Sequence, residues 1–566
     1  MLRANKSLTL VGVSVVGAAL ALSACGGGGS TKNGGTSTKK GGTLTYQYAG
    51  SPVTSWDPQN SYIGVDLTNE SRLFSRSLVQ LSTTNTVAAA AKPVPDLATN
   101  TGTSSNGAKT WKFTLKSGVK WQDGSAVTCE DVKYGAERSF APAAAGGPTY
   151  AKTYLGLSKY AGPGTAGQSD FDKQVTCSGN TITYNFKLAW PDFPLAIASL
   201  REFDPYKKSQ DKGTKSNYTV FSDGPYKLQG SWVTGTGGTF VRNPEYSAST
   251  DGVRKALPDK IIFKDNTNQV TTISSLIQDN PADQASVTYI NVPSASFSQT
   301  TGANVKDRVD NVGTTYIDYL QPNMKRMTNP KVRQALAMAT DQNAYIKALG
   351  GSAYGTAAYS LLNPTVTGYQ LNSTFKSEIT GNAAAAKKIL QSAGVPMPYP
   401  IKYTYSNNTA NATSQAQALA ATWDQAGFKV TLNAVSAHYY PTIRTPSDNS
   451  DVYWASWSQD WAAASTILPP LFDARINLSS SSKSSDYGSY SSNTVNGLFD
   501  KAAQQTSQSA AASVYNQADV QLAKDLAYIP LAQRKFVLVY GSKVTNFQAG
   551  PVTASYPDLG VIGVKQ

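Results

Sequence analysis

Apolar residues along this chain repeat with two different periods, and the two periods alternate from one segment to the next. In residues 43–48 every second residue is apolar, and the same holds for Trp111, Phe113 and Leu115, as in a strand with one buried face. Residues 330–339 instead show the three- to four-residue spacing of an amphipathic helix. Because the two patterns alternate over most of the length, the sequence predicts α/β lobes.

The densest local signals come from two strand patterns and a helix start that follow one another directly. The strands are predicted at 110–115 and 119–121, with glycine-containing turns after each. Thr128 then stands where the N-cap of a helix belongs, and Glu130 and Asp131 favour the positive end of the helix dipole.

Cap residues bracket further elements. Asn329 is suited to an N-cap and Pro330 to the first helical position, and glycines follow two later helices. The remaining predicted elements are helices over 66–81, 330–339, 383–393 and 415–426, and strands over 226–241 and 428–432.

The N-terminus has a different pattern. Arg3 and Lys6 precede an apolar run, 8–22, which ends in a small-residue stretch before Cys25 and a glycine tract. This order is that of an export signal with a cleavage site. The run is shorter than the roughly 20 residues that a membrane-spanning helix needs.

Leu22-Ser23-Ala24-Cys25 resembles the lipobox of bacterial lipoproteins, in which the cysteine is diacylated and becomes the mature N-terminus. The resemblance implies a signal peptide over 1–24 and a membrane anchor at Cys25. The resemblance also implies a place on the outer face of the cytoplasmic membrane. Residues 26–42 are Gly, Ser, Thr, Asn and Lys, a composition that predicts a flexible coil, so the lipidated Cys25 and a Gly-rich tether together take 25–42. An ordinary signal peptide with a chance cysteine is the alternative.

Composition limits the class of protein. A length of 566 residues indicates two or three lobes. The net charge of +14 is scattered without a basic stripe, so nucleic-acid binding is not expected. The 31 Tyr and 9 Trp can line pockets, or equally fill sheet faces and seams between lobes.

The cysteines and the histidine narrow the chemistry further. Outside the cytoplasm, Cys129 and Cys177 indicate a disulfide, and two separate buried thiols are the alternative. The only histidine, His438, lies in a context more typical of a partly buried structural residue than of a base. Catalytic and metal-binding motifs are absent, so we expect no enzyme, no metal and no cofactor.

Six segments, taken in order, are similar to the extracytoplasmic solute-binding proteins of peptide-type ABC importers, solute-binding protein family 5. The similarity covers nearly all of 43–566. The most specific segment is 111–138, where Cys129 replaces a small residue. The six are 111–138, 223–228, 329–336, 387–394, 457–461 and 529–531.

The resemblance implies an α/β fold of the periplasmic-binding-protein-like type II (cluster C), in which two lobes close on the ligand and an additional lobe enlarges the body. The solute-binding domain would take 43–566. Within it, lobe I would comprise about 43–64, 216–312 and 536–566, the additional lobe about 65–215, and lobe II about 313–535.

The same resemblance implies a function. The protein would be a monomer that binds a peptide between its lobes and delivers it to an ABC permease with its ATPase subunits. Strand-type hydrogen bonds would recognise the peptide main chain, and water-filled pockets would accept varied side chains.

The family's ligand site transfers to particular residues. Asp460 would pair with the α-amino group of the peptide, because a buried ammonium needs a carboxylate. Trp457 and Trp461 would frame it, and Tyr48, Ala49, Gly50 and Ser51 would face the ligand from the other lobe. The alternative for Asp460 is a solvated loop acid or a local cap.

Two departures from the family pattern keep other ligands open. Gln321 stands where asparagine is usual, and 462–464 is Ala-Ala-Ala where Pro-Asp-Pro is usual. A modified peptide or an oligosaccharide would then be the ligand. An extracellular hydrolase and a sensor or adhesive lipoprotein without a transport role are the remaining alternatives.

Overall fold

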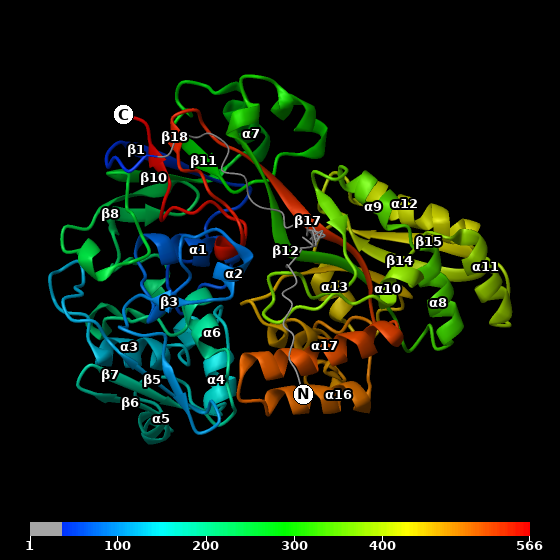
Figure 1. Cartoon of the computed structure of the whole chain (residues 1–566), viewed down its shortest axis with the longest axis horizontal. Coiled ribbons are helices and arrows are strands. Elements are labelled where there is room, and N and C mark those ends of the chain that lie inside the picture. Colours follow the sequence, from blue (N-terminus) through cyan, green and yellow to red (C-terminus); the bar gives the residue numbers. More distant parts are fainter. Residues whose placement is uncertain (1–36) are drawn as a thin grey trace, which may run out of the picture.

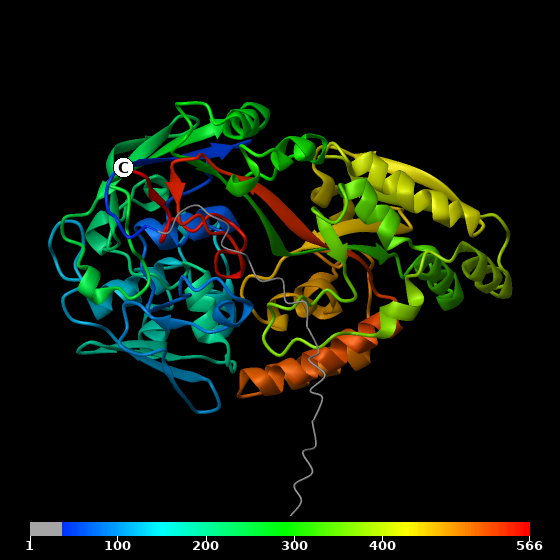
Figure 2. The ribbon, with the colours of Figure 1, turned by 45° about the horizontal axis from the view of Figure 1, so that its top comes forward.

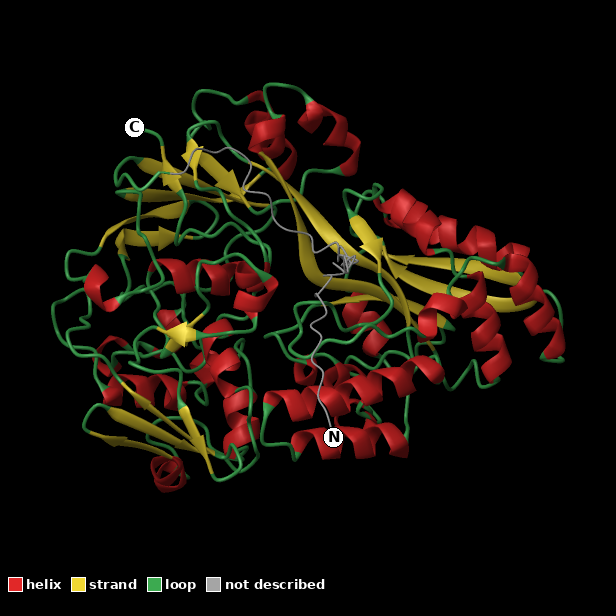
Figure 3. Ribbon diagram, in the orientation of Figure 1, coloured by secondary structure: helices red, strands yellow, loops and turns green. Residues whose placement is uncertain are grey.

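The computed structural model describes residues 37–566, and three sheets of four or more strands organise them (Figures 1 and 3). The signal peptide and Cys25 lie outside the described residues. The names lobe I, additional lobe and lobe II are kept below for the residue ranges proposed above. In the part of the chain that the structure describes, no helix is both long and apolar enough to cross a membrane.

The residue ranges of lobe I hold a five-stranded sheet. Aromatic side chains such as Trp56, Phe240 and Phe263 form its core. The predicted strand over 226–241 is two antiparallel strands, because the chain turns at Gly235 in a left-handed conformation. The sheet order is β11 (Ser286–Thr288), β1 (Thr43–Ala49), β10 (Lys260–Thr267), β9 (Gly237–Arg242) and β8 (Tyr226–Val233).

Helix α1 (Gly64–Leu73) is shorter than predicted, since the sequence indicated a helix up to Leu81. The main-chain N–H of Arg76 donates to Asp223, and the hydroxyls of Ser75 and Ser77 donate to Asp204. These tertiary contacts hold the chain in an extended course that leads into β2 (Val79–Gln80), which pairs with β3 (Val94–Pro95).

The additional lobe contains a four-stranded sheet and helix α3 (Cys129–Arg138). Thr128 and Asp131 form a reciprocal capping box at its start, as the local sequence indicates. Cys129 and Cys177 form a disulfide that joins α3 to β6. The predicted strand 119–121 is reduced to a single bridge between Lys120 and Ala126. The sheet order is β4 (Thr103–Ser105), β5 (Thr110–Thr114), β7 (Thr181–Asn185) and β6 (Val175–Ser178).

The residue range of lobe II holds a six-stranded sheet with helices on its faces (Figure 3). The helices predicted around 330–339, 383–393 and 415–426 are present as α8 (Pro330–Ala339), α11 (Ala383–Ser392) and α12 (Ala412–Gln425). The sheet order is β13 (Gly355–Ala357), β17 (Ile529–Val539), β12 (Val309–Pro322), β16 (Val452–Trp457), β14 (Tyr399–Ser406) and β15 (Phe428–Val435).

Two long strands connect lobe II to lobe I. β12 and β17 pair antiparallel, and both run through the proposed boundaries between the two lobes. Figures 1 and 2 show them as the strands that leave the six-stranded sheet and reach the five-stranded sheet. There, the main-chain N–H of Val292 donates to the carbonyl of Val537.

The end of the predicted tether is held against the folded body. Ser37 and Asn546 exchange two hydrogen bonds of 2.9 and 2.7 Å, and the N–H of Gly41 donates to the carbonyl of Leu257. The expectation of a flexible tether therefore does not hold at Ser37, Gly41 and Gly42, because lobe I supplies partners for their main chain.

Buried ion pairs join lobe I to the additional lobe. The guanidinium of Arg138 contacts both carboxylate oxygens of Asp57 at 2.5 and 2.6 Å, and neither side chain is more than 1% exposed. Arg254 binds Asp96 and Arg72 binds Asp558 in the same way, each with side chains almost fully buried. The two lobes thus share a set of charges that water does not reach.

We predict that Arg138→Met lowers the free energy of unfolding by about 3–5 kcal/mol, because it leaves the buried Asp57 carboxylate without its partner. Urea unfolding followed by circular dichroism measures the change. The matched control is Lys120→Met, since the Lys120–Glu245 pair is partly exposed, with side chains 49% and 34% accessible; it should cost less than about 1 kcal/mol. Equal losses of unfolding free energy in the two variants would contradict the claim that burial makes the Arg138–Asp57 pair the more important one.

Candidate ligand-binding cleft

A cavity of about 390 Å³ lies where the three lobes meet. Residues from lobe I, from the additional lobe and from lobe II line it together. Its walls include Tyr62, Ala198–Leu200, Thr315, Tyr316, Ser456–Ala462 and Pro551–Ala554. A cavity built from all three lobes changes shape whenever the lobes move relative to one another.

The wall from lobe II is the loop that follows β16. Trp457 ends β16 opposite Ile317 of β12, and its indole N–H donates to the carbonyl of Thr466 at 3.1 Å. The Oγ atoms of Ser458 and Thr315 lie 2.6 Å apart. These contacts tie the start of the loop to β12 and to the loop's own far end, so Asp460 is presented on a fixed turn.

Asp460, predicted to bind a ligand amino group, lies in the cavity wall. Its Oδ2 accepts hydrogen bonds from the hydroxyls of Tyr62 at 2.7 Å and Tyr150 at 2.5 Å. Tyr62 belongs to lobe I and Tyr150 to the additional lobe, so the carboxylate connects all three lobes. Burial raises the pKa of the Asp460 carboxyl above its ordinary value, and the two phenol donors act in the opposite direction.

Trp461, predicted to frame Asp460, has a second role. It lines the cavity but is only 2% exposed, because its ring packs into the core of the additional lobe. The ring lies edge-on to Tyr150 with centroids 4.6 Å apart. Its indole N–H donates to Asp192 Oδ2 at 2.6 Å, and the hydroxyl of Ser465 donates to the same oxygen at 2.9 Å. The loop of lobe II is thus fastened to the additional lobe.

Sequence reasoning missed Asp192. It directly precedes helix α6 (Phe193–Ser199), where an acidic residue before a proline-containing first turn is typical of an ordinary helix start. In the structure its side chain instead accepts from lobe II. Burial raises the pKa of Asp192, and its two donors lower it. Tyr62 and Tyr150 were missed as well, because nothing in their local sequence marks them.

The segment predicted to face the ligand from lobe I lies elsewhere. None of Tyr48, Ala49, Gly50 and Ser51 lines the cavity. The hydroxyl of Tyr48 donates to Asp66 of the additional lobe at 2.7 Å, the carbonyl of Ala49 accepts from Tyr289 of lobe I at 2.9 Å, and both residues are buried. A ligand contact for this segment stays a prediction that the cavity does not support.

The single histidine lies outside the cavity. His438 is exposed, in a left-handed conformation at the start of α13 (Tyr439–Arg444), and not partly buried as the sequence suggested. No group of three or more His, Cys, Asp or Glu side chains among residues 37–566 has the arrangement of a metal site.

Comparison with known proteins identifies one family, and similar proteins carry the names of peptide-binding proteins. A family model described as bacterial extracellular solute-binding proteins, family 5, matches residues 92–478. The periplasmic oligopeptide-binding protein OppA of Salmonella typhimurium is 25% identical over 446 residues, which cover 75% of this chain and 76% of that protein. The dipeptide-binding protein of Lactococcus lactis is 25% identical and covers 69% and 72%.

Solved structures show the same fold. The clavulanic acid biosynthesis oligopeptide binding protein 2 superposes with a TM-score of 0.84 at 23% identity, over 94% of this chain and 97% of that one. The Haemophilus influenzae OppA complex with RPPGFSPFR superposes with a TM-score of 0.66 at 20% identity, over 94% and 100%.

We predict that Trp461→Phe weakens the contact between the loop of lobe II and the additional lobe by about 1–3 kcal/mol, because it removes one of the two donors to the buried Asp192 carboxylate. The radius of gyration of the ligand-free protein in small-angle X-ray scattering should therefore increase. Trp457→Phe is the matched control, since its indole N–H binds within lobe II and should leave the radius unchanged. An unchanged radius in Trp461→Phe would show that this contact does not hold the lobes together.

Proposed function

The chain belongs to family 5 of the bacterial extracellular solute-binding proteins, and on this premise we propose that it binds a peptide in the cleft and delivers it to an ABC permease with its ATPase subunits. Support comes from relatives whose printed names are oligopeptide-binding and dipeptide-binding proteins. A similar structure is titled as a complex with the peptide RPPGFSPFR. In this proposal the protein is an extracytoplasmic receptor and not an enzyme.

The main support for the proposal is that Asp460 has no cationic partner within residues 37–566. Its carboxylate lies in the cavity wall, and the hydrogen bonds that it accepts within residues 37–566 come from the neutral phenols of Tyr62 and Tyr150. A carboxylate that has lost much of its water is stabilised far more by a cation than by neutral donors. The α-amino group of a peptide is a cation of the right size, and its ammonium would complete the set of donors around Asp460.

The stretch of β12 beside the loop could pair with an extended main chain. The register between β12 and β17 breaks between Gly313 and Ile317, so residues 314–316 lie outside the ladder. Thr315 and Tyr316 from this break line the cavity. The carbonyls of Thr314 and Thr315 and the N–H of Tyr316 already have partners. A peptide strand would therefore use the other main-chain groups of this stretch, in hydrogen bonds that do not depend on its sequence.

The lobes have distinct roles in this proposal. Lobe I and the additional lobe would act as one body, and lobe II would close on the peptide by bending β12 and β17. The hydroxyls of Tyr62 and Tyr150 reach Asp460 from the opposite side of the cleft. On closure they would therefore bind the same carboxylate that holds the amino group of the peptide. Cys25 would carry the lipid that keeps the monomeric receptor at the outer face of the membrane.

We predict that Asp460→Asn weakens the binding of free peptides by about 1.5–3 kcal/mol, because the ammonium loses its charged partner. Native mass spectrometry of a defined mixture of di- to nonapeptides first selects a binding peptide. Isothermal titration then compares this peptide with its N-acetylated form.

The N-acetylated peptide is the control, since it lacks the ammonium and should bind both proteins with similar affinity. Equal weakening of both peptides by Asp460→Asn would overturn the assignment of Asp460. Binding of oligosaccharides, with no peptide selected from the mixture, would overturn the proposed ligand class.

A further inference from the structure

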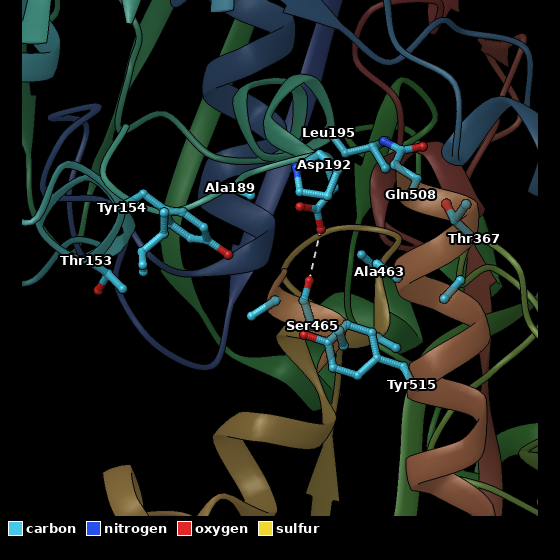
Figure 4. Close-up of a pocket in the computed structure, with 17 residues that line it drawn as sticks. Thr153, Tyr154, Ala189, Asp192, Leu195, Thr367, Ala463, Ser465, Gln508 and Tyr515 are labelled. Carbon is cyan, nitrogen blue, oxygen red and sulfur yellow. Dashed lines mark hydrogen bonds between the residues drawn. The ribbon is translucent and has the colours of Figure 1, made fainter. Parts of the chain in front are cut away.

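A second cavity, of about 130 Å³, lies between the additional lobe and lobe II (Figure 4). The contact from Trp461 to Asp192 separates it from the cleft, because Trp461 and Ala462 line the cleft while Ala463–Ser465 line the second cavity. Its walls are mostly aliphatic, and the exposed side chain of Leu188 stands among them. Helices α16 (Asn493–Ala503) and α17 (Gln508–Lys524) supply the lobe II side.

A buried carboxylate borders this apolar space. Asp192 is 6% exposed, and the two side-chain hydrogen bonds that it accepts, from Trp461 and Ser465, both reach Oδ2. No Lys or Arg within residues 37–566 forms an ion pair with it. An anion that burial has separated from water, and that has neutral partners alone, lacks the cation that would offset its desolvation.

Two phenol groups point at the same place. In Figure 4 the hydroxyls of Tyr154, from the additional lobe, and Tyr515, from lobe II, are directed toward the space beside Asp192 and Ser465. Tyr515 is 7% exposed, and neither hydroxyl has a hydrogen-bond partner in the part of the chain that the structure describes. The ring of Tyr154 is fixed by stacking on Trp190, with centroids 3.8 Å apart.

We propose that this cavity binds a small primary amine that carries an aromatic or short aliphatic group. The ammonium would pair with Asp192 and donate to the unpartnered phenol oxygens of Tyr154 and Tyr515. The apolar group would occupy the aliphatic space between Leu195 and α17. The cavity, at about 130 Å³, is slightly smaller than the apolar cavity of about 150 Å³ that accommodates benzene, so it has room for no more than one ring.

The site has a consequence for the cleft. Tyr154 and Asp192 come from one lobe and Ser465 and Tyr515 from the other, so the binding site is complete only while the two lobes are in contact. An amine bound there favours the closed arrangement, and by reciprocity a ligand that closes the cleft favours the amine.

Isothermal titration of the full-length protein with benzylamine and with benzyl alcohol tests the proposal. The two probes have similar shape but only the amine carries a charge. Benzylamine should bind at least tenfold more tightly than benzyl alcohol, and Asp192→Asn should remove most of this difference. Ala503→Trp should abolish the binding of both probes, because Ala503 lines the cavity at an exposed end of α16 and a large ring there fills the space.

Benzylamine titrations of Asp460→Asn show whether the amine binds in the cleft or in the second cavity. Benzylamine binding that survives Asp460→Asn but not Ala503→Trp supports the proposal. Binding that is lost in Asp460→Asn and kept in Ala503→Trp places the amine in the cleft and overturns it. Equal affinities for benzylamine and benzyl alcohol in the unsubstituted protein, or no binding of either, also overturn it. If Asp192→Asn does not fold, the Ala503→Trp variant still shows whether benzylamine binds in the second cavity.

Discussion

Buried Arg–Asp pairs join lobe I to the additional lobe, and they decide which lobe is left to move. Arg138 with Asp57, Arg254 with Asp96, and Arg72 with Asp558 cross this boundary with almost no exposure to water. Removing one partner of such a pair leaves the other charge buried without a counter-ion, which costs several kcal/mol. We therefore expect lobe I and the additional lobe to move as one body. Lobe II lacks any such ion pair to the other lobes within residues 37–566 and is joined through β12 and β17.

The contacts across the cleft are of a different kind. Asp460 accepts from two tyrosine hydroxyls, and Asp192 accepts from an indole N–H and a serine hydroxyl. Hydrogen bonds from neutral donors to a carboxylate are weaker than buried ion pairs, and they can be exchanged for water when the lobes separate. Asp460 belongs to the loop of lobe II that follows β16, and Asp192 of the additional lobe accepts from Trp461 and Ser465 of the same loop. Each lacks a cation, which is why a ligand that brings one would stabilise the closed arrangement.

Much of the fold could be predicted because its signals are local. The capping box at Thr128, Pro330 at the first turn of α8 and the alternation in β1 each lie within a few residues. Predictions failed where distant contacts decide, as at the end of α1, which tertiary hydrogen bonds determine. The site divides in the same way. The position of Asp460 could be expected from its motif, but its partners Tyr62 and Tyr150 are 398 and 310 residues away in sequence.

Distances between spin labels, measured by double electron–electron resonance, test most directly whether lobe II alone moves on the other two lobes. Exposed positions suit the labels: Val233 in lobe I, Lys173 in the additional lobe and Met397 in lobe II, each replaced by cysteine in protein with Cys25→Ser. On adding a binding peptide, the 233–397 distance should shift and its distribution narrow, while the 233–173 distance stays the same. A 233–173 distance that shifts as much as the 233–397 distance, or a 233–397 distance that does not change, would contradict the account.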